Sequence, residues 1–380
     1  MDLFLNRGEP LNFKRIIMSF DYVLMGIVLI IFTLGMLAIA SATDVMNFGI
    51  TRQVQMQAFS FLFGLVIIAL LQFVNYEVFG EFYWWLYGIA ILLLVIIFVP
   101  GIGVTRFSAR SWIDLGPIDF QTSEIAKIAY IIFLAKFVEK SGGIQSFKDV
   151  LKSGLTLIPI LGLVLKQPDL GTALVFISAT FGILLVNGLK YWQIGLGIGS
   201  FAAAIPLIYP KLENHQRQRL DSFLNPNDAT LPGYYQVMQS KITIGSGQMY
   251  GQGLFEGVYH RLNYLPVQES DFIFAVFVEE TGFVGGMGVI LLYMFMLLRL
   301  ITLSRRVKDD FGSNIIIGFI FMFAFQIIEN IAMTLGRMPV TGITLPFFSY
   351  GSTSIVSSMI AIGIAEAIYI RRKTGTFFNN

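Results

Sequence analysis

The sequence predicts an all-α polytopic membrane protein. Hydrophobic residues make up 55% of its 380 residues and charged residues only 13%, whereas soluble domains carry about 25% charged residues. Apolar runs of about 18 residues or more recur along the chain, and such a run is long enough to cross the membrane as a helix. The net charge of +2 argues against nucleic acid as a partner, and the absence of Cys excludes disulfides and thiol catalysis.

Ten apolar runs are expected to form the membrane helices. The first stays in the chain as an anchor, because the residues before it are mixed in polarity and the run is too long for a signal peptide. The fifth run is short and meets the sixth at a polar break from Lys166 to Gly171, which leaves nine spans as the alternative. Pro168 and the charges around it favour two helices. The runs lie near 22–40, 54–73, 82–99, 122–138, 153–166, 170–187, 191–209, 272–299, 312–334 and 347–370.

The distribution of Lys and Arg predicts how these helices are oriented. Loops rich in Lys and Arg face the cytoplasm, and with ten spans both termini lie on that side. Segments near 100–121 and 210–271 then face outward. The second segment, between spans seven and eight, is long enough that we expect it to be structured, and residues 1–380 form one membrane domain. The basic segments are 7–15, 136–152, Lys190, 299–308 and 371–373.

An acid at the end of the long outer segment is the main catalytic candidate. Asp271 closes the polar stretch YLPVQESD and directly precedes an apolar run. At the water-facing mouth of a membrane helix, a partly desolvated carboxylate is suited to proton transfer. The alternative is an ordinary helix N-terminal residue, stabilised by free backbone amides and the helix dipole.

Two groups of charged residues lie near the outer ends of predicted spans. Glu124 and Lys127 have the i,i+3 spacing of an intrahelical ion pair, and Arg110 before them would add a guanidinium fork for phosphate oxygens in a cationic mouth. Lys166 and Asp169 flank the predicted helix break. A broken helix there either lines a binding site or is sealed by a Lys–Asp pair.

Two more polar groups lie inside predicted spans, where an ionisable side chain costs about 3 kcal/mol at the bilayer centre. One group shares a helix stripe and favours interhelical hydrogen bonds. The other is a pair of acids two turns beyond Asp271, followed by glycines that favour close helix packing. No His and Cys constellation for a metal exists, and carboxylate-bound Mg²⁺ or Mn²⁺ is an open alternative. The groups are Gln326, Glu329 and Asn330, and Glu279 and Glu280 with Gly282, Gly285 and Gly286.

Five stretches together resemble one family, the SEDS (shape, elongation, division and sporulation) proteins, which are bacterial peptidoglycan glycosyltransferases. Within this family, RLDSFLNPNDATLPGYY at 219–235 and the Ala after DFIF are most similar to the RodA elongation branch, and less to the FtsW division and the sporulation branches. Residues 121–123, 267–270 and 352–353 depart from the usual family motifs, but the family's key acid matches Asp271. The stretches are ARSWIDLGPIDFQTSEIAKI (109–128), KQPDLGTA (166–173), GYYQVMQSKITIGSG (233–247), LPVQESDFIFAVFVEETG (265–282) and MPVTGITLPFFSYGSTS (338–354).

The resemblance implies that lipid II is polymerised on the outer face of the bacterial plasma membrane. A glycan chain on undecaprenyl diphosphate is the donor, and the 4-hydroxyl of the lipid II GlcNAc attacks its anomeric carbon to form a β-1,4 bond with inversion. Asp271 would be the general base. Positive charge would stabilise the departing diphosphate, with a divalent cation as a further candidate. The cations would be Arg110, Lys127, Lys166 and Arg337, oriented by Glu124 and Asp169.

The resemblance also implies partners. These are a class B penicillin-binding protein, which is a transpeptidase, and the rod-complex membrane proteins, in addition to membrane lipids. The alternative function is a flippase for lipid-linked cell-wall precursors, which needs access from both sides of the membrane. The strongest motifs cluster on one predicted side, which favours an enzyme.

Overall fold

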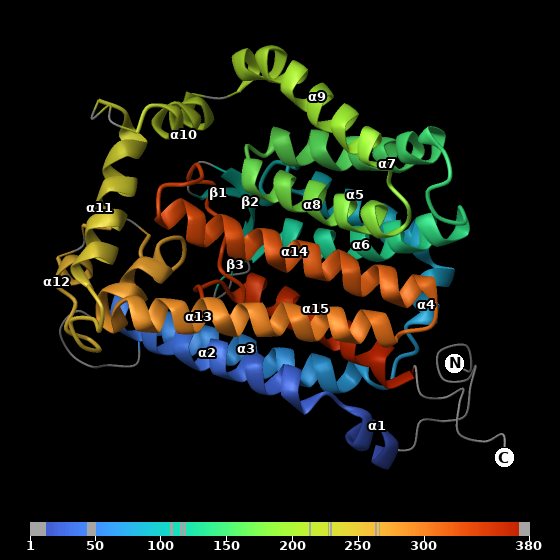
Figure 1. Cartoon of the computed structure of the whole chain (residues 1–380), viewed down its shortest axis with the longest axis horizontal. Helices are drawn as coiled ribbons and strands as arrows, with labels where there is room; N and C mark the ends of the chain where they lie inside the picture. Colours follow the sequence, from blue (N-terminus) through green and yellow to red (C-terminus); the bar gives the residue numbers. More distant parts are fainter. Residues whose placement is uncertain are drawn as a thin grey trace.

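The computed structural model is a bundle of long helices that run side by side (Figure 1). Helices α10 to α12 lie at one end of this bundle, and α1 and α4 lie at the other. Each of the ten predicted apolar runs overlaps one of the long helices. The structure describes residues 13–43, 51–106, 109–114, 116, 119–212, 214–226, 228, 230–262, 264–265 and 267–371.

The long helices differ in how far they are enclosed by the rest of the protein. Among the described residues, five helices are long and apolar enough to cross a membrane, namely α2, α3, α13, α14 and α15. Within the most apolar window, 89% of α15 and 67% of α14 is buried, against 28% of α3 and α13. Helices α14 and α15 therefore form the centre of the bundle, and α3 and α13 present apolar side chains to the surroundings. The long helices are α2 Tyr22–Thr43, α3 Arg52–Leu71, α5 Tyr83–Ile96, α6 Thr122–Lys140, α7 Phe147–Lys166, α8 Leu170–Val186, α9 Tyr191–Ile208, α13 Ile273–Arg306, α14 Asp310–Thr334 and α15 Ser352–Arg371.

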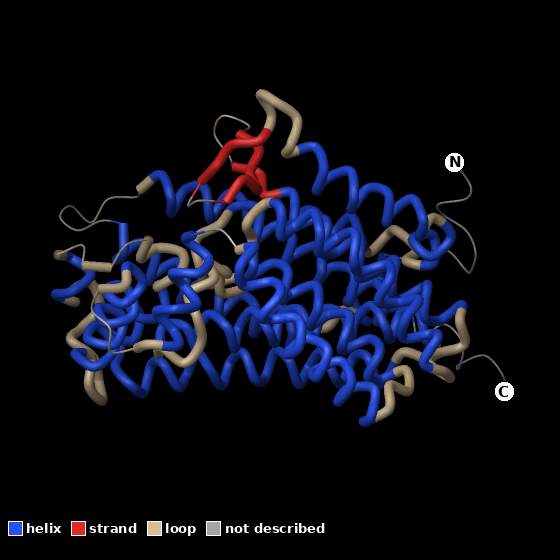
Figure 2. The backbone as a smooth tube through the Cα atoms, turned by 90° about the horizontal axis from the view of Figure 1, so that it is seen from above, coloured by secondary structure: helices blue, strands red, loops and turns tan. Residues whose placement is uncertain are grey.

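Smaller elements cover the end of the bundle that carries the main candidate acid. The predicted outer segment 210–271 holds three helices, and the 100–121 segment holds a three-stranded antiparallel sheet that the sequence reasoning did not anticipate. Figure 2 shows the strands together at one edge of the helices. The elements are α1 Phe13–Ser19, α4 Glu77–Glu81, β1 Gly103–Arg106, β2 Ala109–Asp114, β3 Asp119–Gln121, the 3₁₀ turn Tyr209–Lys211, α10 Asn214–Leu224, α11 Pro232–Ser246 and α12 Val258–Arg261.

The fifth and sixth apolar runs form two helices, α7 and α8, with a break between them. Asp169 caps α8, because its carboxylate accepts bonds from the Thr172 amide at 2.9 Å and the Thr172 hydroxyl at 2.7 Å. Lys166 does not pair with Asp169. Its ammonium lies over the Phe98 ring, 5.1 Å from the centroid. The predicted sealing pair is therefore wrong, because each side chain has a different neighbour.

Helix α13 is interrupted at Gly282, and the close packing expected there is against the loop around Gly251 instead of another helix. Gly282 has φ +70°, a left-handed conformation that breaks the helix. The freed backbone groups bond to the preceding loop: the Phe283 amide donates to the Gln248 carbonyl at 2.8 Å, and the Gln252 amide donates to the Glu279 carbonyl at 3.0 Å. The loop thus enters the break in α13 and is held there by backbone hydrogen bonds.

The buried acids beside this break, Glu279 and Glu280, accept hydrogen bonds from backbone amides of the segment between α11 and α13. The Glu279 carboxylate accepts from the Tyr259 amide at 2.7 Å, and the Glu280 carboxylate accepts from the Phe255 amide at 2.9 Å. The Ser41 hydroxyl on α2 also donates to Glu280. These hydrogen bonds hold the loop against α13 and α2, and they account for two ionisable groups inside a predicted span.

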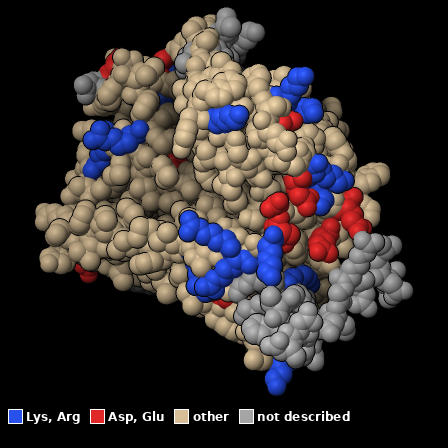
Figure 3. Space-filling model, turned by 45° about the vertical axis from the view of Figure 1, so that its right-hand side comes forward, with Lys and Arg blue, Asp and Glu red and all other residues tan. Residues whose placement is uncertain are grey.

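Charged side chains gather at the opposite end of the bundle. Figure 3 shows Lys, Arg, Asp and Glu together there, beside a flank that is largely uncharged. Helix α6 ends there at Lys140, and α13 ends there with Arg305 and Arg306 in its last turn. Charge at one end of an apolar bundle is typical of the membrane–water boundary. The two ends of this multi-pass membrane protein therefore differ in chemistry.

Candidate active site

Asp271 lies in the loop just before α13, at the end of the bundle that carries α10 to α12. Helix α13 begins at Ile273, its N-cap residue is Phe272, and no side chain caps it. The alternative that Asp271 is an ordinary capping residue is therefore wrong. Its carboxylate instead accepts a hydrogen bond from the Ser270 hydroxyl at 2.8 Å. The Asp271 carboxylate is therefore not engaged in capping α13.

The loop that carries Asp271 is fixed by the connection between α14 and α15. The Ser349 hydroxyl donates to the Ser270 carbonyl at 2.6 Å, and the Tyr350 amide donates to the Glu269 carbonyl at 3.0 Å. On the other side, the Gln268 amide group donates to the Ala42 carbonyl of α2 at 2.8 Å. Backbone anchors from two directions hold the acid in place, as a catalytic group requires.

The surroundings of Asp271 combine burial with charges of both signs. The side chain is half-buried, and burial raises the pKa of its carboxyl above the ordinary range. The Ser270 hydrogen bond and the Arg219 guanidinium of α10 act in the opposite direction, and Glu269 adds to the increase. A raised pKa brings the carboxyl closer to the pH at which it can accept a proton from a hydroxyl.

Helix α14 reaches the same place with two buried polar residues. The Asn330 amide donates to the Asp271 carbonyl at 3.1 Å and to the Ile343 carbonyl at 2.8 Å. The Thr341 hydroxyl donates to the neighbouring acid, Glu329. The predicted interhelical role is therefore wrong for these two residues, because their hydrogen bonds go to the loops that surround Asp271.

Glu124 and Lys127 form the predicted intrahelical ion pair. The Lys127 ammonium lies 2.7 Å from the Glu124 carboxylate, and both residues are buried. The second carboxylate oxygen accepts from the Ser357 hydroxyl of α15 at 2.6 Å. Asp169 lies within electrostatic reach of both charges. The structure therefore brings these three predicted residues together, as one satisfied cluster between α6, α8 and α15.

The remaining predicted cations are placed apart from this cluster. Lys166 is exposed at the end of α7, and Arg337 is exposed just after α14, where its amide donates to the Ala332 carbonyl at 2.8 Å. Arg110 belongs to β2, but its side chain lies outside the part of the chain that the structure describes. Among the described residues, the cation that acts electrostatically on Asp271 is Arg219, not Lys166 or Arg337.

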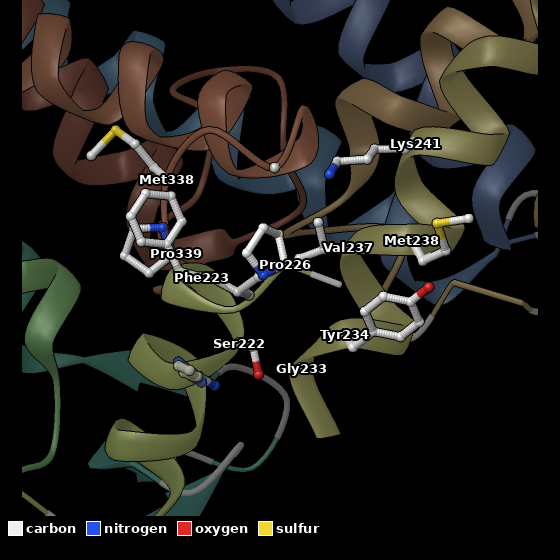
Figure 4. Close-up of a pocket in the computed structure, with 13 residues that line it drawn as sticks. Ser222, Phe223, Pro226, Gly233, Tyr234, Val237, Met238, Lys241, Met338 and Pro339 are labelled. Carbon is white, nitrogen blue, oxygen red and sulfur yellow. The ribbon is translucent and has the colours of Figure 1, made fainter. Parts of the chain in front are cut away.

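A pocket lies between α10, α11 and the loop after α14, and one of its lining residues, Arg219, acts electrostatically on Asp271. Figure 4 shows its apolar wall of Phe223, Val237 and Met338, with Lys241 at one side. Arg219 and Lys241, neither chosen as a site residue from the sequence, put two cations in a mostly apolar lining. Both lie in stretches that resemble the SEDS family, and this resemblance is the sequence signal that could have identified them. The lining is Arg219, Ser222, Phe223, Pro226, Gly233, Tyr234, Val237, Met238, Lys241, Gly336, Met338, Pro339 and Val340.

The described residues contain no cluster of three or more His, Cys, Asp or Glu side chains that could hold a metal ion. Asp271 and Glu329 supply two carboxylates at the site, and Glu269 faces Asp271 from its own loop. The described residues therefore offer no set of three such side chains as ligands for Mg²⁺ or Mn²⁺.

Known proteins resemble this chain over most of its length. A family model described as "Cell cycle protein", for FtsW, RodA and SpoVE, matches residues 21–374. Stage V sporulation protein E of Bacillus subtilis (strain 168) is 34% identical over 362 residues, 90% of this chain and 95% of that protein. Peptidoglycan glycosyltransferase MrdB of Escherichia coli (strain K12) is 35% identical over 314 residues, 82% of this chain and 84% of MrdB.

Solved structures share the fold. The rod shape determining protein RodA of Thermus thermophilus superposes with a TM-score of 0.70 at 30% identity, over 93% of this chain and 98% of RodA. A chain of a peptidoglycan synthase complex, solved in work on the coordination of polymerization and crosslinking, superposes with a TM-score of 0.79 at 31% identity and the same coverage. With its sequence match and its fold in agreement, the chain belongs to the FtsW, RodA and SpoVE family, the SEDS proteins.

Proposed function

We propose that this protein is a peptidoglycan glycosyltransferase that polymerises lipid II into glycan strands for cell elongation. The observation that carries the proposal is Asp271, a half-buried acid whose loop is held by Ser349 and Asn330 and on which Arg219, a cation of the pocket lining, acts. Relatives named as peptidoglycan glycosyltransferases and the RodA fold support it. The elongation role rests on the RLDSFLNPNDATLPGYY run, since relatives from two branches are equally similar in identity.

In the reaction, Asp271 acts as the general base. Its carboxylate takes the proton from the 4-hydroxyl of the lipid II GlcNAc as the oxygen bonds to the anomeric carbon of the donor. The bond from that carbon to the diphosphate breaks on the opposite face, which gives the inverted β-1,4 linkage. The raised pKa of Asp271 makes the carboxylate a stronger base than an exposed one.

The departing diphosphate requires positive charge. Lys127 is already neutralised by Glu124, and Lys166 lies over Phe98, so their predicted roles in binding phosphate are weakened. Arg219 reaches Asp271 electrostatically and lines the pocket with Lys241. We therefore assign the diphosphate to Arg219 and Lys241, with the predicted Arg110 and Arg337 as further contributors.

The predicted topology supports an active site on the outer face of the membrane. Residues 1–380 form one membrane domain with ten spans and cytoplasmic termini, and the 210–271 segment and Asp271 face outward. The basic residues at the far end of the bundle fit the cytoplasmic face. A class B penicillin-binding protein and rod-complex proteins are the proposed partners, and the synthase complex among the similar structures supports the first.

The test is glycan formation from purified lipid II in liposomes, with and without the cognate class B penicillin-binding protein. The proposal predicts long glycan strands from the wild-type protein. A parallel vesicle assay follows labelled lipid II across the bilayer. Transport without any glycan, with the partner present, would replace the polymerase with the flippase.

A further inference from the structure

Glu329 is a buried acid beside Asp271 that the proposed reaction does not use. The residue has no exposed surface, and one carboxylate oxygen, Oε2, has no hydrogen-bond partner among the described residues. The other oxygen accepts from the Thr341 hydroxyl. A buried ionised carboxylate with a single donor is costly, because burial removes the water that would stabilise its charge.

Three observations place the carboxylates of Glu329 and Asp271 close to the same segment, Thr341 and Gly342. Thr341 donates to Glu329, and the next residue, Gly342, lies so close to Asp271 that an added Cβ would be 3.4 Å from its Oδ2. Consecutive Cα atoms are about 3.8 Å apart, so both acids contact one dipeptide. Asn330, the neighbour of Glu329, bonds the Asp271 carbonyl at 3.1 Å.

The described side chains around Asp271 and Glu329 supply too little positive charge to neutralise two carboxylates. Arg219 of α10 acts on both Asp271 and Glu329, and Asp271 itself acts on Glu329. Glu269, from the loop of Asp271, adds another negative charge. Lys241 of α11 lies against Gly336, beyond the end of α14.

The nearest other cluster adds no free cation. Lys127 of α6 is bonded to Glu124, and Asp169 at the start of α8 lies near both. Among the described residues, one guanidinium, that of Arg219, therefore acts on the acidic group formed by Asp271, Glu329 and Glu269. Two close carboxylates in a low-dielectric site do not both ionise at neutral pH.

We propose that Asp271 and Glu329 hold one proton between them at neutral pH, so that the site presents one negative charge rather than two to an anionic diphosphate. The inference rests on the proposed function for its substrate. Glu329 is then a positioning residue, while the half-buried Asp271 touches the substrate and remains the base. Loss of the shared proton at alkaline pH would repel the diphosphate.

The first readout is the unfolding temperature of the full chain in detergent between about pH 5 and pH 9. The unfolded chain releases the shared proton, because free carboxyl groups have pKa values near 4. The folded state therefore binds more protons, and stability falls as pH rises. We expect a decrease of roughly 3 °C or more for the wild type and for Glu256→Gln, an exposed control, and a smaller decrease for Glu329→Gln, in which only Asp271 of the pair still titrates. Identical curves for the wild type and Glu329→Gln would overturn the proposal.

The second readout is the kinetics of lipid II polymerisation. Glutamine imitates the neutral acid, so Glu329→Gln should keep kcat at pH 7 within about threefold of the wild type. Its KM should stay constant as pH rises, whereas the wild-type KM should increase on the order of tenfold. Complete loss of activity in folded Glu329→Gln at pH 7 would contradict the shared proton.

A second variant guards against misfolding of Glu329→Gln. Asp271→Asn removes the negative charge that helps Glu329 to keep its proton, so the decrease in unfolding temperature between pH 5 and pH 9 should be smaller than in the wild type; an unchanged decrease overturns the shared proton. The unfolding temperatures need no substrate, so they test the pair even if the wild type makes no glycan. Absent glycan would count against the proposed function alone.

Discussion

Two buried polar clusters in the same bundle differ in the signs of their charges and in how completely their oxygens are hydrogen-bonded. In the cluster of Glu124, Lys127 and Ser357, the charges have opposite signs and both glutamate oxygens are bonded. In the cluster of Asp271 and Glu329, the charges have the same sign and one buried oxygen has no partner among the described residues. A satisfied cluster holds helices together, whereas an unsatisfied one keeps proton-binding capacity for chemistry.

Breaking the satisfied cluster should have the largest effect on stability. Lys127→Met leaves the Glu124 charge buried without its ion-pair partner, which costs about 3–5 kcal/mol of unfolding free energy. Thermal unfolding of the purified protein measures this loss. The double variant Lys127→Met with Glu124→Leu removes both charges and should recover much of the stability. Wild-type stability in Lys127→Met alone would mean that the pair does not hold the bundle.

Removing the cation of the unsatisfied cluster should impair substrate binding. Arg219→Ala is expected to raise the KM for lipid II by about tenfold to a hundredfold, because a charge-assisted contact to the diphosphate is lost. Arg219→Lys keeps the charge and should recover part of the affinity. Steady-state kinetics at several lipid II concentrations distinguish KM from kcat. An unchanged KM in Arg219→Ala would place the diphosphate elsewhere.

Loosening the support of the acid should have a smaller effect. Asn330→Ala leaves the carbonyls of Asp271 and Ile343 without their donor, at a cost of about 1–3 kcal/mol. We expect a lower kcat together with modest destabilisation. Gln326→Ala, one turn earlier on α14, is the matched control and should keep kcat. Equal kcat values in the two variants would show that Asn330 does not position the acid.

The smallest expected effect is a shift of the pH profile. Protonation of Asp271 at low pH removes the base, so the rate at saturating lipid II should fall as the pH is lowered, around a midpoint higher than that of an exposed carboxyl group. Arg219 lowers the pKa of Asp271, so Arg219→Ala should move this midpoint to higher pH. Rates measured over the acidic pH range for the wild type and Arg219→Ala test the direction of this shift. A midpoint that moves to lower pH would contradict the assignment of the base.

Much of the helical architecture follows from the sequence. Apolar runs located the long helices, because a membrane helix must be apolar along its length, and the polar break at Pro168 separated α7 from α8. The i,i+3 spacing of Glu124 and Lys127 predicted their ion pair because both lie on one helix. Local patterns were sufficient where the partners are neighbours in the chain.

The rest depends on contacts between distant segments. Arg219, Asp271 and Glu329 lie in three different elements, and no spacing rule relates them. The break at Gly282 was missed because a glycine in an apolar run fits close packing as well as a left-handed turn. The small sheet was missed because its strands are short and lie in a connecting segment.

The central claim is that Asp271 is the base of a polymerase. The most direct test compares glycan strands made from lipid II by the wild type, Asp271→Asn and Asp310→Asn, an exposed control at the far end of the bundle. We expect glycan strands from the wild type and Asp310→Asn, and a loss of activity of at least about 100-fold in folded Asp271→Asn. Wild-type rates from folded Asp271→Asn would contradict it.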